Sequence, residues 1–94
     1  MQPAIYILAS RPNGTLYVGV TSDLIQRIWQ HKNNAVEGFT HKYGVHTLVY
    51  FEQHATMHDA IGREKQIKAG SRAKKIALIM SMNPRWEDLY PGLL

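Results

Sequence analysis

The sequence contains no cysteine among its 94 residues, which excludes disulfide bonds and thiolate metal sites. It also lacks long hydrophobic runs. The apolar stretches at 4–9 and 76–80 are far too short to cross a bilayer. A secretory signal would have basic residues before its apolar stretch, and none precedes residues 4–9. We therefore expect one soluble domain over residues 1–94, located in the cytoplasm and without a membrane partner.

Acidic residues are scarce relative to basic ones: seven Asp and Glu stand against eleven Lys and Arg, for a net charge of +4. This excess favours a polyanionic partner such as nucleic acid. Six basic residues lie within thirteen positions, interrupted by one acidic residue: Arg63, Lys65, Lys68, Arg72, Lys74 and Lys75. Taken alone, such a run is more typical of a solvated helix face than of a binding surface.

The N-terminal third of the chain predicts a β-hairpin followed by a helix. Residues 4–9 and 15–20 are rich in β-branched and aromatic residues. Between them, Arg11-Pro12-Asn13-Gly14 is typical of a reverse turn, because Asn-Gly tolerates positive φ. Asp23 is a candidate N-cap for a helix that ends near Lys32.

The remainder predicts one more strand and two more helices. Residues 33–44 are polar and predict a loop with at most one helical turn, and residues 47–52 predict the third strand. Thr56 and Ser71 are candidate N-caps of two helices, the first ending at Gly70 and the second at Asn83-Pro84. The order β-β-α-β-α-α indicates an α+β fold, in which helices flank a three-stranded, mostly antiparallel sheet.

Four polar groups stand out as candidates for chemistry. Tyr6 and Tyr17 lie on the two strands of the hairpin, while Arg27 and His31 lie four residues apart and share a helix face. Guanidinium binds phosphate through a planar fork of donors, and imidazole can donate to a phosphate or to a tyrosine. Each residue alone is more often a packing or surface residue.

Glu64 lies in the apolar stripe of its helix, between Ala60 and Ile67. A carboxylate in such a position requires a partner or a metal ion. One interpretation is a solvated pair with Lys68, four residues later. The other is magnesium binding, since Mg²⁺ often takes one or two carboxylates together with phosphate oxygens and water.

Read together, these residues resemble the GIY-YIG nuclease family, most closely its small single-domain members. Ala4-Ile5-Tyr6 and Tyr17-Val18-Gly19 correspond to the two tripeptides, with Ala4 in place of glycine and Val18 in place of isoleucine. The segments that also match are 21–27 with His31, 38–43, 48–50, 60–68 and Asn83-Pro84. The resemblance covers nearly the whole chain.

The resemblance implies an endonuclease that hydrolyses phosphodiester bonds in DNA, in repair or recombination. Tyr6 or Tyr17 would activate water, Arg27 would stabilise phosphoryl charge, and His31 would bond a tyrosine or a phosphate. Glu64 would hold Mg²⁺ or Mn²⁺, with Gly19 and Asn83 in supporting positions. The basic run Arg63, Lys65, Lys68, Arg72, Lys74 and Lys75 would bind flanking phosphates.

Two other function classes stay open from the sequence. The first is a non-catalytic nucleic-acid-binding module on the same fold, which the positive charge favours equally well. The second is a protein-interaction domain in which Trp29, Phe39 or the C-terminal aromatic residues form a contact patch. Substrate specificity would come from the domain itself, would come from a protein partner, or would be absent.

Overall fold

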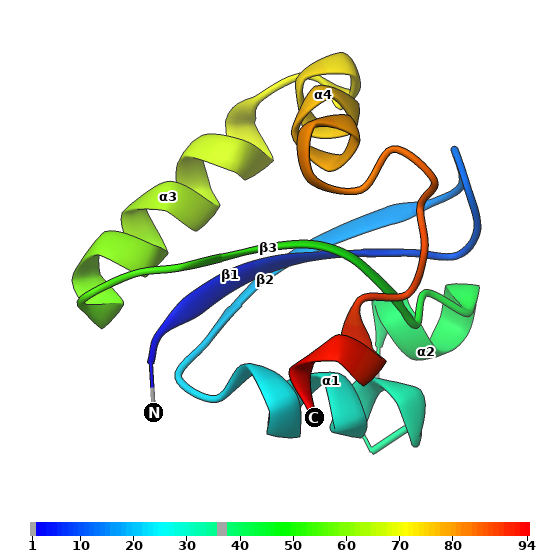
Figure 1. Ribbon diagram of the computed structural model, residues 1–94, viewed down its shortest axis with the longest axis horizontal. Helices are drawn as coiled ribbons and strands as arrows, with labels where there is room; N and C mark the ends of the chain where they lie inside the picture. The colour runs from blue at the N-terminus through cyan, green and yellow to red at the C-terminus, as the bar shows by residue number, and fades with distance from the viewer. Residues whose placement is uncertain (1, 36–37) are drawn as a thin grey trace.

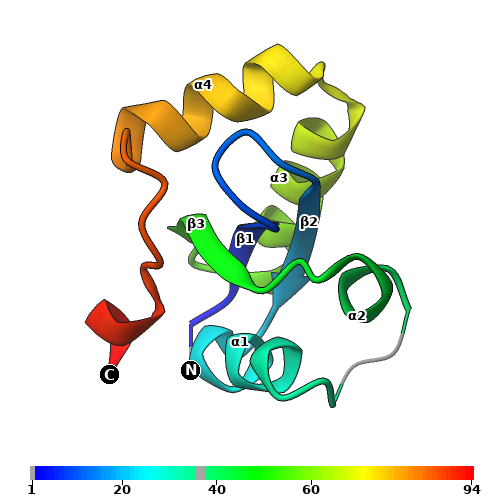
Figure 2. The ribbon, with the colours of Figure 1, turned by 90° about the vertical axis from the view of Figure 1, so that its right-hand side faces the viewer.

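The computed structural model describes residues 2–35 and 38–94, which form three layers (Figure 1). The elements are β1 (Ala4–Ala9), β2 (Leu16–Thr21), α1 (Leu24–Lys32), α2 (Phe39–Tyr43), β3 (Thr47–Gln53), α3 (Met57–Ala69), α4 (Arg72–Met82) and a 3₁₀ turn, η1 (Tyr90–Leu93). Helices α3 and α4 cover one face of the sheet, while α1 and η1 cover the other (Figure 1). The turned view places α2 on the same side as α1, away from α4 (Figure 2).

The sheet has the order β2-β1-β3, and both pairings with the central strand are antiparallel. Asn13 takes a φ of 58° in the hairpin turn, and the Gly14 amide donates to the Arg11 carbonyl at 2.9 Å. The register between β1 and β3 shifts between Ile7 and Leu8. At this shift, the consecutive β3 residues Val49 and Tyr50 are both buried. The α+β fold and the antiparallel sheet predicted from the sequence are confirmed.

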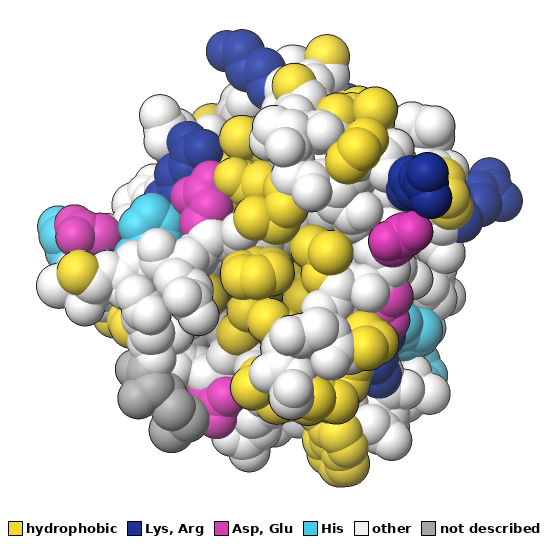
Figure 3. Space-filling model, viewed as in Figure 1, with side chains coloured by type: hydrophobic (Ala, Val, Ile, Leu, Met, Phe, Trp, Pro, Cys, Tyr) yellow, Lys and Arg dark blue, Asp and Glu magenta, His cyan; other side chains and the backbone are white. Residues whose placement is uncertain are grey.

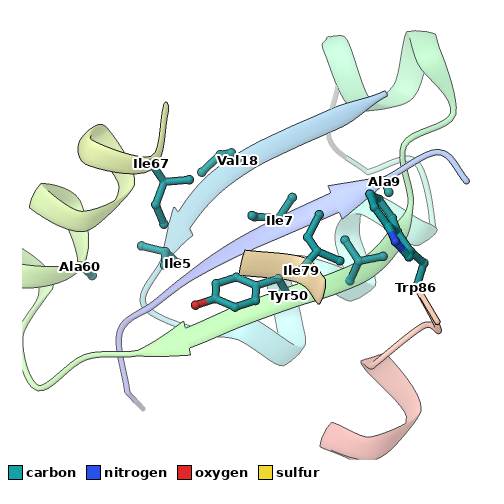
Figure 4. Packing of buried hydrophobic residues seen from close by; sticks show 10 residues of the cluster. Ile5, Ile7, Ala9, Val18, Tyr50, Ala60, Ile67, Ile79 and Trp86 are labelled. Carbon is teal, nitrogen blue, oxygen red and sulfur yellow. The ribbon is translucent and has the colours of Figure 1, made fainter. Parts of the chain in front are cut away.

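Each face of the sheet carries its own hydrophobic core. On the α3 and α4 side, Ile5 and Ile7 of β1 pack with Ala60, Ile67 and Ile79 of the two helices (Figure 4). Tyr6 and Leu8, which alternate with Ile5 and Ile7 along β1, point to the opposite face. There they pack against α1 and the C-terminal segment. This alternation places neighbouring residues of β1 in different cores.

Local signals fix the helix ends. Each of the three longer helices follows a side chain that accepts a hydrogen bond from a first-turn amide: Asp23 for α1, Thr56 for α3 and Ser71 for α4. After α4, the chain returns along β3, where the Leu48 amide donates to Asp88 and the Leu89 amide donates to the Leu48 carbonyl. This segment covers part of the outer edge of β3.

The structure departs from the sequence prediction in a few places. Helix α2 makes the order β-β-α-α-β-α-α, and it lies in the segment predicted as a loop; positions 36 and 37 of that segment fall outside the described residues. Two hydrophobic residues lie outside the cores, since Ile61 of α3 is 37% exposed and Leu94 is 78% exposed. Among the described helices, none is both long and apolar enough to cross a membrane.

Candidate active site

A chain of buried hydrogen bonds links three elements on the α1 side of the sheet. The Tyr6 hydroxyl of β1 lies 3.0 Å from Nε2 of His31 on α1. Nδ1 of the same imidazole lies 2.9 Å from Oγ1 of Thr40 on α2. All three side chains are 2% exposed, so the imidazole has a protein partner at each nitrogen and is held in one orientation.

Tyr17 completes a group of three rings. Its centroid lies 6.3 Å from that of Tyr6 and 5.7 Å from that of His31, and Tyr17 is only half-buried. Gly19 pairs with Tyr6 across the hairpin. A Cβ atom at position 19 would lie 2.4 Å from both Cζ and the hydroxyl oxygen of Tyr6. Glycine is therefore required at this position for the Tyr6 ring to lie over β2.

Burial and charge keep both Tyr6 and His31 neutral. Burial, together with the smaller effects of Arg27 and His46, lowers the pKa of His31 from 6.5 to about 4. Burial, with the nearby Tyr17, raises the pKa of Tyr6 far above its ordinary value of 10. At neutral pH the site therefore presents a phenol and an unprotonated imidazole in contact.

Arg27 and Glu64 bring opposite charges to this group. Arg27 favours ionisation of the Tyr6 hydroxyl and lowers its pKa, whereas the Glu64 carboxylate raises it. The two charges therefore act on the same hydroxyl in opposite directions. Glu64 belongs to α3, whose buried residues pack on the face of the sheet opposite to Tyr6.

The Glu64 side chain is 13% exposed and pairs with Lys68, whose Nζ lies 3.0 Å from its Oε2. The ion pair that the spacing predicts is therefore present. It does not exclude metal binding, because an ammonium group at the surface can be displaced from a carboxylate.

The six residues of the basic run differ in their surroundings. Three donate hydrogen bonds within the protein: Arg63 to Glu52 and Gln66, Arg72 to the carbonyls of Asn13 and Gly14, and Lys75 to the carbonyls of Lys68 and Gly70. Lys65 and Lys74 are exposed. On the face shown in Figure 3, Lys and Arg lie at the margins of a central hydrophobic band.

The comparisons with known proteins identify the family of this chain. A family model described as the GIY-YIG catalytic domain matches residues 2–77. The chain belongs to the GIY-YIG family. The resemblance identified from the sequence is thereby confirmed.

Relatives of this GIY-YIG domain match over most of its length. A UPF0213 protein of Staphylococcus saprophyticus is 39% identical over 75 residues, which cover 80% of this chain and 90% of the relative. Another, from Clostridium perfringens, is 36% identical over 84 residues, or 89% of each chain. The solution NMR structure of a UPF0213 protein from Bacillus halodurans matches with a TM-score of 0.58 and 28% identity, over 94% of this chain and 93% of that one.

The Glu64 carboxylate of this GIY-YIG domain is a ligand of the type that Mg²⁺ binds. Within residues 2–35 and 38–94, no three His, Cys, Asp or Glu side chains gather closely enough to hold a metal ion. An ion at Glu64 would therefore complete its coordination with phosphate oxygens and water, which is the pattern that Mg²⁺ accepts.

Sequence reasoning missed Thr40 and the surroundings of Glu52. Thr40 holds the second nitrogen of His31, and its only signal is a place in the segment 38–43 that resembles the family. Glu52 accepts hydrogen bonds from Arg63 and Tyr50 and lies 3.2 Å from Nε2 of His54. Asn83, predicted as a supporting residue, bonds the Val49 carbonyl and so ties the end of α4 to β3.

Proposed function

We propose that this GIY-YIG domain is a metal-dependent endonuclease that hydrolyses phosphodiester bonds in DNA. The observation that carries the proposal is the convergence of Tyr6, Tyr17 and His31 with the charges of Arg27 and Glu64. A module that only binds nucleic acid has no need for a carboxylate among phosphate-binding groups, because the carboxylate repels phosphate.

The proton from the attacking water passes through Tyr6 to His31 in this proposal. A standing phenolate is disfavoured, because the pKa of Tyr6 is raised by burial. The neutral imidazole has one N–H; when Nδ1 donates it to Thr40, Nε2 accepts the Tyr6 proton. Tyr6 can then take a proton from water as it gives its own to His31, without ionising beforehand.

Arg27 and Glu64 supply the electrostatic part of the site. Arg27 is half-buried and lines a polar depression of about 130 Å³ beside the start of α1. Its guanidinium would bind the scissile phosphate and stabilise the charge that develops on it. A Mg²⁺ or Mn²⁺ ion held by Glu64 would act as a Lewis acid on the phosphate.

The test is cleavage of supercoiled plasmid and of a branched duplex by purified protein, with Mg²⁺, with Mn²⁺ and with chelator. The variant Glu64→Gln keeps the shape of the side chain and removes its charge. We expect metal-dependent cleavage by the wild type and loss of at least a hundredfold in Glu64→Gln. Glu87→Gln is the matched control, because Glu87 is an exposed glutamate outside the site.

Cleavage that is equal in wild type and Glu64→Gln would contradict the proposal. Salt-sensitive, metal-independent DNA binding without cleavage would instead favour the non-catalytic binding module.

A further inference from the structure

A row of aromatic rings leads from the buried site to the protein surface. The Tyr17 ring stacks on Phe39 of α2, with centroids 6.2 Å apart and an interplanar angle of 27°. Phe39 in turn lies 4.8 Å from Tyr43, one turn along the same helix. We call Tyr17, Phe39 and Tyr43 the α2 aromatic cluster. Since Tyr17 also contacts His31 and Tyr6, the cluster and the candidate active site share one residue.

The outer rings of the cluster are open to solvent. Phe39 is 45% exposed and Tyr43 is 50% exposed, whereas Thr40 on the same short helix is buried against His31. Thr40 thus fixes which side of α2 faces the core, and it leaves the rings of Phe39 and Tyr43 partly open to solvent. Large apolar groups placed together at the surface, next to a catalytic site, are typical of a ligand-binding surface.

Positive charge flanks these rings. Lys42 of the same helix is exposed, and its Nζ lies 5.4 Å from the centroid of the Tyr43 ring. Rings together with a cation are the combination that binds single-stranded nucleic acid: bases stack on the rings and the backbone phosphates pair with the cation. Neither base stacking nor phosphate pairing requires a particular base sequence.

We propose that the α2 aromatic cluster stacks an unpaired nucleobase of the cut DNA strand, next to the scissile phosphate. This inference rests on the proposed nuclease function and names the form of its substrate. A base inside a duplex presents only its edges to a protein, so a base that stacks on Phe39 or Tyr43 must be unpaired or flipped out. Tyr17 belongs to both the cluster and the candidate active site, so a base on the cluster would lie beside the reacting phosphate.

The test measures binding without cleavage. Protein carrying Glu64→Gln is titrated, in chelator, into an oligonucleotide with one 2-aminopurine in an unpaired stretch, and into the same sequence fully paired. We expect quenching of the fluorophore on binding and at least tenfold tighter binding of the unpaired form. The further change Tyr43→Leu, and Phe39→Leu in a separate protein, should each weaken binding about tenfold and reduce the quenching.

Two variants control for loss of folding and for general hydrophobicity. Tyr43→Phe keeps the ring and should bind like the parent. Trp29→Leu removes an aromatic side chain of similar exposure, 51%, on α1 and outside the cluster, and should also bind like the parent. Equal affinity for paired and unpaired DNA, or equal weakening by Trp29→Leu and Tyr43→Leu, would overturn the inference.

The two proposals fail in different ways. Metal-dependent cleavage of paired and unpaired substrates at equal rates, with no effect of Tyr43→Leu, would remove the base-stacking role and leave the nuclease. Quenching that depends on Tyr43, in a wild-type protein that cuts nothing with metal present, would overturn the nuclease and leave the base-binding site.

Discussion

The Tyr6 ring occupies the space that a side chain at position 19 would need. A methyl group there would lie 2.4 Å from the ring, well inside the distance that carbon atoms tolerate. We predict that Gly19→Ala displaces Tyr6 from His31, lowers the free energy of unfolding by about 1–3 kcal/mol and lowers cleavage more than tenfold. Urea unfolding and plasmid cleavage measure the two effects.

Gly62→Ala is the control for that substitution. Gly62 lies within α3, where a Cβ would meet nothing within 4 Å in the described structure. The change should raise the free energy of unfolding by about 0.5–1 kcal/mol, as alanine does in a helix. Similar destabilisation by both changes would contradict the role assigned to Gly19.

The low pKa of His31 predicts a stability that depends on pH. The folded state holds His31 neutral down to about pH 4, whereas an unfolded histidine gains a proton near pH 6.5. Stability from this residue is therefore complete above pH 6.5 and is lost as the pH falls toward 4. We predict that the free energy of unfolding falls by about 2–3 kcal/mol more in the wild type than in His31→Asn between pH 7 and pH 4.5. Urea unfolding at each pH measures this difference.

The matched control for this measurement is His58→Asn, because His58 is an exposed histidine at the start of α3. It should lose as much stability as the wild type on acidification. If His31→Asn also lost as much stability on acidification as the wild type, the titration of His31 would not be the cause of the pH dependence.

Lys68 competes with a metal ion for Glu64. Its ammonium lies 3.0 Å from the carboxylate and opposes the approach of a dication. We predict that Lys68→Met strengthens Mn²⁺ binding by about three- to tenfold, the scale of one screened charge at this distance. Electron paramagnetic resonance of free Mn²⁺ measures this directly, without DNA. Lys65 is an exposed neighbour and serves as the control. If Lys65→Met strengthened Mn²⁺ binding equally, the cause would be the net charge of the protein and not the Glu64–Lys68 ion pair.

Arg63 fixes α3 to β3. Its Nε and Nη2 each lie 3.0 Å from an oxygen of Glu52, and its Nη1 lies 2.8 Å from Gln66. Burial alone would raise the pKa of Glu52, but hydrogen bonds from Arg63 and Tyr50 lower it below its ordinary value. Lysine cannot make the two-pronged contact.

We therefore predict that Arg63→Lys lowers the free energy of unfolding by about 1–2 kcal/mol and weakens cleavage, since Glu64 is the next residue of the helix. Lys65→Arg makes the reverse exchange on an exposed position and should leave both unchanged. An unaffected Arg63→Lys protein would show that the ion pair does not hold the helix.

The strands and the long helices could be predicted because their signals are local. The Asn13-Gly14 turn and the capping residues Asp23, Thr56 and Ser71 act on neighbouring amides, and the observed ends agree to within a residue or so. Helix α2 could not, because it has five residues, starts at Gly38 without a side-chain cap, and depends on burial of Thr40.

The residues of the candidate site follow a family pattern, but their surroundings depend on distant contacts. The imidazole of His31 is completed by Thr40, a threonine in a polar segment with no periodicity. Arg72 reads as a free cation in the sequence, yet its bond to the Asn13 carbonyl spans 59 positions. Only the folded chain brings such partners together, so hydrogen bonds between residues far apart in the sequence could not be predicted from local patterns.

The placement of Glu64 on the far side of the sheet has a consequence for synthesis. A ribosome releases Tyr6, Tyr17, Arg27 and His31 well before residue 64, and β1 must wait for β3 before its second edge is paired. The carboxylate joins the tyrosines only when α3 docks onto the completed sheet. For the nuclease proposed above, the nascent chain would therefore be harmless to DNA until most of the protein has emerged and folded.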